Sequence, residues 1–182
     1  MFKLAVDKEI ELVFLDRSLA TALYALIDSN RVYLGQWMPW VEHTSSVADV
    51  ETFIEQSIVG FSKGETLVCG IEYRGDLCGI ISYNTISQAL KKVVLGYWLS
   101  PHLQGKGIIN RSCHKLIEYA FNELQMEKVE IRVATKNIPS RNVCKKLGCS
   151  LEGEITNAEN LNGTIVDHAV YGIYADQYSK EQ

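Results

Sequence analysis

Residues 92–124 read KVVLGYWLSPHLQGKGIINRSCHKLIEYAFNEL and contain a strand, a glycine-rich loop and a helix in direct succession. Apolar and aromatic residues dominate 92–99, which is typical of a buried strand. After the loop, apolar residues recur at i, i+3, i+4, i+7, i+8 and i+11, the spacing of one helical face. This stripe, which predicts a helix packed on a sheet, consists of Cys113, Leu116, Ile117, Ala120, Phe121 and Leu124.

The segments on either side continue this alternation of strands and helices. The predicted strands are 10–15, 66–73, 77–86, 92–99, 128–134, 149–156 and 165–175. The other predicted helices are 17–29, 47–62 and 139–147, with a loop at 31–44 and a polar turn at 156–163. Ser46 is the expected N-cap of helix 47–62, which is expected to bury Val50, Phe53, Ile54, Ile58 and Phe61. An α/β fold of the mixed α+β kind follows, with helices covering a mixed sheet.

Composition limits the classes of protein that fit. The 182 residues, 47 % of them hydrophobic, suit a single domain over 1–182. A net charge of −4 argues against a nucleic-acid partner held by phosphate contacts. The five cysteines include no C-x-x-C pair and the four histidines are scattered, so neither a disulfide framework nor a metal site is expected. No run approaches the roughly 18 apolar residues of a membrane span, and a cytoplasmic protein is expected.

The glycine-rich loop Gln104–Ile109 (QGKGII) precedes the clearest helix of the sequence. A helix N-terminus presents unpaired N–H groups to an anion, and Gly105 and Gly107 let a ligand approach the backbone closely. Lys106 adds a positive charge, so a phosphate or pyrophosphate is the natural guest. The alternative is an ordinary glycine turn that begins a helix.

Two motifs together resemble the GNAT acetyltransferases. The loop is similar to that family's acetyl-CoA motif, Gln/Arg-x-x-Gly-x-Gly/Ala, with Ile109 in place of the last small residue. Residues 137–149 (NIPSRNVCKKLGC) resemble N-x-x-S-x-x-V-x-x-K-L-G-F, with Cys149 in place of the aromatic. Residues 34–40 (LGQWMPW), 96–98 (GYW) and 158–163 (AENLNG) resemble the branch that acetylates ribosomal-protein N-termini, in particular the ribosomal-protein-serine acetyltransferases of Gram-positive bacteria.

The resemblance implies the GNAT (acyl-CoA N-acyltransferase) fold. That fold has a mixed, mostly antiparallel sheet of about seven strands, which opens between the fourth and fifth strands (92–99 and 128–134). Backbone groups at the opening would pair with the pantetheine arm of acetyl-CoA like an added strand. The residues implied in acetyl-CoA binding are Tyr97, Trp98, Leu99, Gln104, Gly105, Lys106, Gly107, Ile108, Ile109, Asn110, Asn137 and Asn142. Either asparagine of the second motif, Asn137 or Asn142, would alternatively cap the helix.

Acetyl transfer to an amine also needs an acid for the leaving thiolate and a base for the ammonium. Ser140, beside the expected opening, is the candidate acid; its alternative role is helix capping. Glu159 matches the branch's Ala-Glu-x-Leu-Asn and is the candidate base, its alternative being a solvated turn residue. The competing residues for the base are Glu72, Glu152, Glu154, His43 and His168.

Three aromatic residues, Tyr33, Trp37 and Trp40, are candidates for the acceptor mouth, where rings would bury an amine's carbon stem and attract its cation. Their alternative role is to pack helices together. Cys113 and Cys144 are expected to fill the core, because no histidine is placed to activate them.

The leading hypothesis is transfer of acetyl from acetyl-CoA to an amine, specifically the N-terminal α-amine of a ribosomal protein that begins with Ser or Ala. The alternatives are acetylation of a small amine, such as a polyamine or an aminoglycoside, and a non-catalytic acyl-CoA-binding module. A polyamine site would use clustered carboxylates, for which Glu152, Glu154 and Glu159 are available. The sequence leaves the oligomeric state open, a homo-oligomer included.

Overall fold

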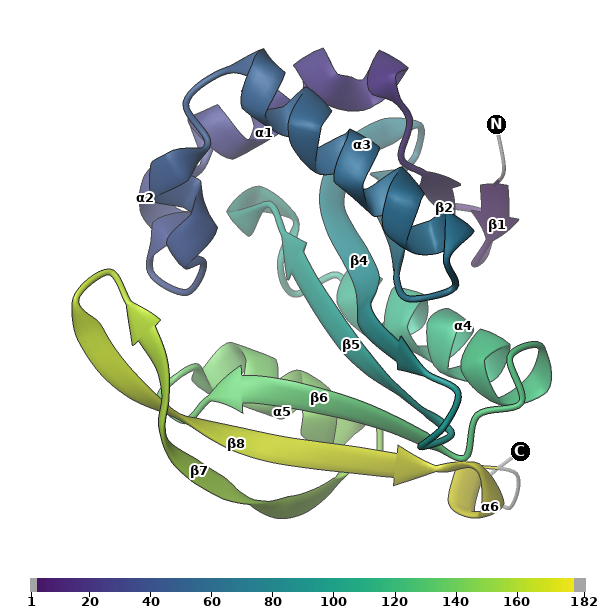
Figure 1. The fold of residues 1–182 in the computed structure, drawn as a ribbon. Helices are drawn as coiled ribbons and strands as arrows, with labels where there is room; N and C mark the ends of the chain where they lie inside the picture. The colour runs from purple at the N-terminus through teal and green to yellow at the C-terminus, as the bar shows by residue number, and fades with distance from the viewer. Residues whose placement is uncertain (1–2, 179–182) are drawn as a thin grey trace.

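A computed structural model describes residues 3–178, and within them eight strands form one mixed sheet, ordered β1-β2-β3-β4-β5-β6-β8-β7 (Figure 1). The strands are β1 (Lys3–Ala5), β2 (Ile10–Phe14), β3 (Leu67–Tyr73), β4 (Asp76–Ser87), β5 (Lys92–Leu99), β6 (Lys128–Ala134), β7 (Ser150–Leu161) and β8 (Thr164–Tyr174). Every neighbouring pair is antiparallel except β5 and β6. The predicted mixed, mostly antiparallel sheet is therefore confirmed.

The helices cover both faces of this sheet (Figure 1). They are η1 (Arg17–Leu19), α1 (Ala20–Ser29), α2 (Arg31–Gly35), η2 (Pro39–His43), α3 (Val47–Ser62), η3 (Pro101–Leu103), α4 (Ile108–Asn122), α5 (Ile138–Lys146) and α6 (Ala175–Tyr178). One core cluster joins α4 and α5 to the strands, and a second joins α1 and α3 to the opposite face. Among the described residues, no helix has the length and apolarity to span a bilayer.

The predicted stripe of α4 is confirmed from Cys113 to Phe121, whereas Leu124 lies beyond the end of the helix and is half-buried. Cys113, Leu116 and Ile117 have no exposed surface and pack in the core cluster that includes β5 and β6. Full burial of one such aliphatic side chain contributes about 1.5–3 kcal/mol. This contact fixes α4 against the sheet, and with it the loop from which α4 begins.

The sheet opens between β5 and β6, as expected. Their pairing runs from Lys92↔Lys128 to Leu95↔Ile131 and stops there, although β5 continues to Leu99. Residues 96–99 keep β4 as a partner on one side only. Figure 1 shows the two strands diverging from this short parallel pair. One edge of β5 is therefore left without a strand partner.

Helix α3 agrees with its prediction in extent but not in burial. Ser46 caps it, and a reciprocal pair of hydrogen bonds between Ser46 and Asp49 completes a capping box. Val50 and Ile54 are buried, whereas Phe53, Ile58 and Phe61 are 43 %, 38 % and 50 % exposed. The helix lies on one end of the sheet, so only the narrow strip facing β3 and α1 is covered.

Three further expectations need correction. β1 was missed because three residues are too short for an alternating pattern. The predicted loop 31–44 contains α2 and η2. The predicted turn 156–163 is strand except at Asn162–Gly163, because β7 runs to Leu161. β7 is an edge strand exposed over most of its length, so its polar sequence gives no apolar alternation.

Candidate active site

A cavity of about 1060 Å³ occupies the opening between β5 and β6. Its walls come from α2 and η2, from the loop before α4, from the start of α5, and from β7 and β8. These segments are distant in the sequence and meet only because β5 and β6 diverge. The cavity gathers most of the predicted site residues in one place.

The glycine-rich loop begins α4 with a backbone that only glycine adopts easily. Gly105 and Gly107 have φ values of 76° and 73°, and Gly107 is the N-cap of α4 without a side-chain cap. A Cβ on either glycine would meet no protein atom within 4 Å. Open space thus lies beside the start of α4, and the first N–H groups of a helix have no intrahelical partner, which is an arrangement that binds phosphate groups. The loop therefore fits the pyrophosphate of acetyl-CoA.

Lys106 departs from its predicted position. The loop residues that line the cavity are Gln104, Gly105, Gly107, Ile108, Ile109 and Asn110. The ammonium of Lys106 instead lies 5.7 Å from the ring centroid of Tyr73, outside the cavity. Ile109 is half-buried against the core while it lines the cavity, so its branched side chain points partly away from the loop.

Ser140 lies in the cavity wall, and its hydroxyl is hydrogen-bonded to Tyr97. The sequence predicts a role for the backbone of Tyr97 but none for its hydroxyl. The Ser140 Oγ is 3.0 Å from the hydroxyl of Tyr97. Asn137 caps α5, because its Oδ1 accepts a hydrogen bond of 3.2 Å from the Ser140 N–H. The Ser140 hydroxyl is thus free of the capping role. Burial raises the pKa of Tyr97 well above its ordinary value, so its phenol stays protonated at neutral pH.

The two helix cysteines near Tyr97 are core residues, as expected. Cys113 and Cys144 are fully buried and free. Burial raises the pKa of Cys144 to about 11, although a hydrogen bond with Tyr97 opposes the shift. Burial likewise raises the pKa of Cys113. Both side chains are therefore neutral thiols rather than nucleophilic thiolates at neutral pH.

Glu159 and His168 form a pair on the opposite wall. Glu159 Oε2 is 3.1 Å from His168 Nε2, and both residues line the cavity. Ile155 pairs with His168 and Glu159 with Val166, so four steps along β7 match two steps along β8. This bulge brings Glu159 next to His168 on one face of the hairpin. Glu159 is a strand residue, not the turn residue that the sequence suggested.

The competing carboxylates lie elsewhere. Glu72 pairs with Lys3 at 3.1 Å, Glu152 with Lys128 at 2.6 Å, and Glu154 with Arg141 at 3.5 Å. None of these three glutamates lines the cavity. The clustered carboxylates expected of a polyamine site are not assembled there.

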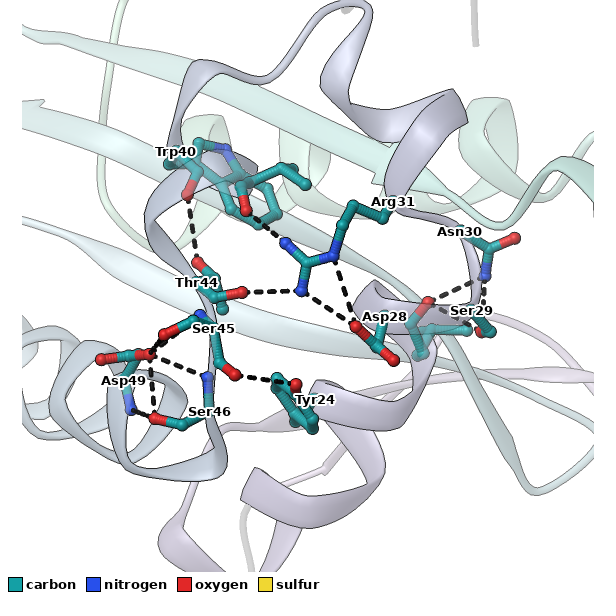
Figure 2. A network of polar contacts seen from close by, with 12 residues as sticks. Tyr24, Asp28, Ser29, Asn30, Arg31, Trp40, Thr44, Ser45, Ser46 and Asp49 are labelled. Atoms are coloured by element: carbon teal, nitrogen blue, oxygen red, sulfur yellow. Dashed lines mark hydrogen bonds and ion pairs between the residues drawn. The ribbon is translucent and has the colours of Figure 1, made fainter.

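The aromatic residues Tyr33, Trp37 and Trp40 all line the cavity. Trp40 also lies 6.2 Å from Trp98 of β5, measured between ring centroids. Arg31 holds the backbone that carries Trp40, because its guanidinium donates to the carbonyls of Val41 and Thr44 at 2.6 and 2.8 Å (Figure 2). The rings therefore have fixed positions around the cavity.

Asn84 and Arg132 are among the polar residues of the cavity that were not predicted. A bulge in β4 between Tyr83 and Thr85 turns Asn84 toward β5, where a Cβ on Gly96 would lie 2.5 Å from its Nδ2. Arg132 of β6 also lines the cavity, with its Nε donating to Glu130 at 2.8 Å. Neither residue gives a sequence signal, because a bulge and a sheet opening become visible only once the register is known.

The fold and the cavity agree with comparisons to known proteins. A family model described as an acetyltransferase (GNAT) domain matches residues 10–150, most of the chain. The chain belongs to the GNAT acetyltransferase family and is an N-acetyltransferase that uses acetyl-CoA. Residues 3–178 hold no group of three or more side chains placed to bind a metal ion.

Several relatives are similar to this chain over most of its length. The protein named "Putative ribosomal N-acetyltransferase YdaF" of Bacillus subtilis (strain 168) is 34 % identical over 184 residues, covering 100 % of both chains. The structure of RimL, the ribosomal L7/L12 alpha-N-protein acetyltransferase, in complex with coenzyme A has a TM-score of 0.93 at 26 % identity, covering 96 % of this chain and 99 % of RimL. The microcin C7 self immunity acetyltransferase MccE, in complex with acetyl-CoA and AMP, has a TM-score of 0.89 at 31 % identity, covering 93 % and 94 %.

Proposed function

We propose that the acceptor is the N-terminal α-amine of a ribosomal protein that begins with Ser or Ala, and that residues 1–182 act as one domain in the cytoplasm. The full-length similarity to YdaF and RimL supports this choice. The observation that carries it is that the Glu159–His168 pair and the Ser140–Tyr97 pair line the same cavity. Asp49, the other carboxylate of the cavity wall, is used in capping α3.

Acetyl-CoA supplies the acetyl group as a thioester, and the free edge of β5 is where this chain would hold it. The N–H and C=O groups of Tyr97 and Leu99 have no strand on the β6 side, so an extended pantetheine arm can pair with them. One of these N–H groups would polarise the thioester carbonyl. A donor of that kind contributes about 10²–10³ in rate.

Glu159 is proposed as the general base. An α-amine has a pKa of about 7.7–8.0, against about 10.4 for lysine, so it needs less help than a lysine does at neutral pH, although most of it is still protonated there. Glu159 removes the ammonium proton directly or through one water, a step that contributes about 10²–10⁴ in rate. His168 orients the carboxylate through their 3.1 Å contact.

Ser140 is proposed as the acid. As the new N–C bond forms and the S–C bond breaks, the Ser140 hydroxyl gives its proton to the departing sulfur. The Ser140 oxygen then regains a proton from solvent, while the Tyr97 phenol, kept protonated by burial, holds it through their 3.0 Å contact. The nitrogen loses two protons in all, one to Glu159 before attack and one as the amide forms; one of them balances the proton gained by sulfur, and the other is released to solvent.

A competition among three acceptors tests the proposal. Equal concentrations of a Ser-initiated peptide, a Lys-bearing peptide with a blocked N-terminus, and spermidine are offered with acetyl-CoA, and products are identified by mass spectrometry. The free N-terminus should be acetylated well ahead of the others. Faster acetylation of spermidine or of the lysine would overturn the choice of acceptor.

A small-molecule amine is the second candidate, because the similar structure of MccE contains AMP and this cavity carries three aromatic rings able to stack on a planar base. A stable aminoacyl-nucleotide analogue added to the competition tests it. Preferential acetylation of that analogue would favour this candidate over the ribosomal protein.

A further inference from the structure

A second hollow, of about 380 Å³, lies between η2 and the turn that joins β7 to β8. Trp40 and His43 line both this hollow and the large cavity, so the two share a wall. In Figure 1 the tip of the β7–β8 pair approaches α2 at this side of the molecule. The hollow is therefore placed where an acceptor chain would leave the cavity.

Glu42 supplies the formal charge of this hollow. Its side chain is exposed, and within residues 3–178 it makes no hydrogen bond or ion pair. The neighbouring amides are already used: Asn160 accepts from the Gly163 N–H at 2.9 Å, and Asn162 donates to the Gly35 carbonyl at 3.0 Å. An unpaired carboxylate beside the indole of Trp40 is a combination that attracts a cation on an aliphatic stem.

Hydrogen bonds fix the backbone on both sides of this hollow. Arg31 donates to the Val41 and Thr44 carbonyls on either side of Glu42, and Figure 2 shows its contact with Thr44. The Asn162–Gly35 hydrogen bond ties the opposite wall to α2. Because the backbone is fixed before any acceptor arrives, binding there would require little ordering.

We propose that this hollow is an acceptor subsite that receives the side chain of a Lys or Arg at the third or fourth residue of the acceptor. The proposal rests on the proposed N-terminal acetylation. The hollow is lined by residues one to four positions beyond Glu159 on the hairpin. A strand advances about 3.3 Å per residue, so an extended acceptor whose amine is at Glu159 reaches the hollow within three or four residues.

The test uses Ser-initiated peptides of one length, neutral except for a single Lys at position 2, 3, 4 or 7, with glutamine elsewhere at those positions. We expect kcat/KM to be about fivefold to tenfold higher for Lys at position 3 or 4 than for Lys at position 7. Glu42→Gln should remove this preference, and Glu42→Lys should transfer it to peptides with Glu at the same position.

Two controls separate the subsite from the reaction itself. Glu123→Gln, an exposed glutamate that lines neither hollow, should keep the preference. A Ser-initiated dipeptide, too short to reach the hollow, should react equally with wild type and Glu42→Gln. Equal values for all Lys positions, or a preference that survives Glu42→Gln, would overturn the subsite while leaving N-terminal acetylation intact.

An ammonium group also occurs in polyamines, so spermidine is included as a separate arm. If spermidine is acetylated slowly and at the same rate by wild type and Glu42→Gln, while the peptides show the expected preference for Lys at position 3 or 4, the result supports a subsite for a side chain. Spermidine acetylated in a Glu42-dependent way, with no Ser-initiated peptide acetylated, overturns the proposed function and this subsite for peptides together.

Discussion

Ser140 and Tyr97 share one hydrogen bond, yet the two hydroxyl groups are expected to contribute unequally. Ser140→Ala removes the proposed proton donor, and kcat should fall about tenfold to a hundredfold. Tyr97→Phe keeps the packing and removes only the partner of Ser140, so a smaller fall is expected. Neither should change the Kd for acetyl-CoA, measured by calorimetry. A wild-type kcat in Ser140→Ala would assign the acid to another group.

Glu159 is expected to matter most at neutral pH, where much of an α-amine is still protonated. Glu159→Gln should lower kcat/KM at pH 7 and recover as pH rises past about 8, because the free amine then no longer needs a base. Glu154→Gln, on the same strand but outside the cavity, serves as the matched control. If Glu159→Gln retains the wild-type rate at pH 7, the residue has no role as a base.

The residue-scale assignments were predictable only where a motif fixes them. The motif predicts Ser140, but it does not decide whether Asn137 caps the helix or binds a ligand, and the structure identifies Asn137 as the cap. The hydroxyl of Tyr97 could not be predicted to meet Ser140, because the contact depends on how α5 packs on β5. The bulge in β7 that brings Glu159 next to His168 could not be predicted either, because it depends on the register of β7 with β8.

At the scale of elements, the backbone at the start of α4 depends on Gly107, so a substitution there should affect acetyl-CoA binding directly. A branched residue at φ 73° is strained by about 1–2 kcal/mol, and its side chain would enter the space proposed for the pyrophosphate. Gly107→Val should therefore lose acetyl-CoA binding, and with it the rise in Tm that the ligand gives wild type.

Gly75 offers a matched control for that variant. It has a φ of 90°, a Cβ there would also meet nothing within 4 Å, and it lies in the turn between β3 and β4. Gly75→Val should suffer similar strain, lowering Tm, while keeping its affinity for acetyl-CoA. Unchanged affinity in Gly107→Val would contradict the loop assignment.

Elements with one buried face were predicted well, and exposed ones were not. α4 shows its stripe because a continuous face is buried in the core. β7 is at the sheet edge with both faces largely exposed, so its sequence shows no alternation and its outer half was taken for a turn. α3 has apolar residues beyond the strip that is covered, which made its burial look wider than it is.

At the scale of the molecule, Glu130 joins β5 and β6 where the sheet is still closed. Burial disfavours its charge, but hydrogen bonds from Lys92, Arg132 and Lys128 lower its pKa to about 2. Because the pKa is lower in the folded state, the stabilisation is fully present above about pH 4.5 and is lost as pH falls toward 2. This linkage stabilises the folded state at neutral pH.

Urea unfolding between pH 2 and 6 measures that contribution. Wild type should lose stability steadily below pH 4.5, and Glu130→Gln should be less stable at pH 6 with a flatter profile. Glu118→Gln, the half-buried ion-pair partner of Lys115, should keep the wild-type slope. A wild-type slope in Glu130→Gln would place the acid sensitivity in other carboxylates.

The short parallel contact between β5 and β6 has a mechanical consequence. Only four residue pairs join β5, the last strand before α4, to β6, the first strand after it. The two halves of the sheet can therefore move relative to each other about this short contact. A molecule that binds in the opening and forms hydrogen bonds with β5 would restrict the motion of β5 relative to β6. Hydrogen–deuterium exchange should then slow at Tyr97–Leu99 when acetyl-CoA binds, with protection extending to β6 across the gap. Without acetyl-CoA, β5 and β6 would move more freely relative to each other, and each binding event would reduce that motion until the product leaves.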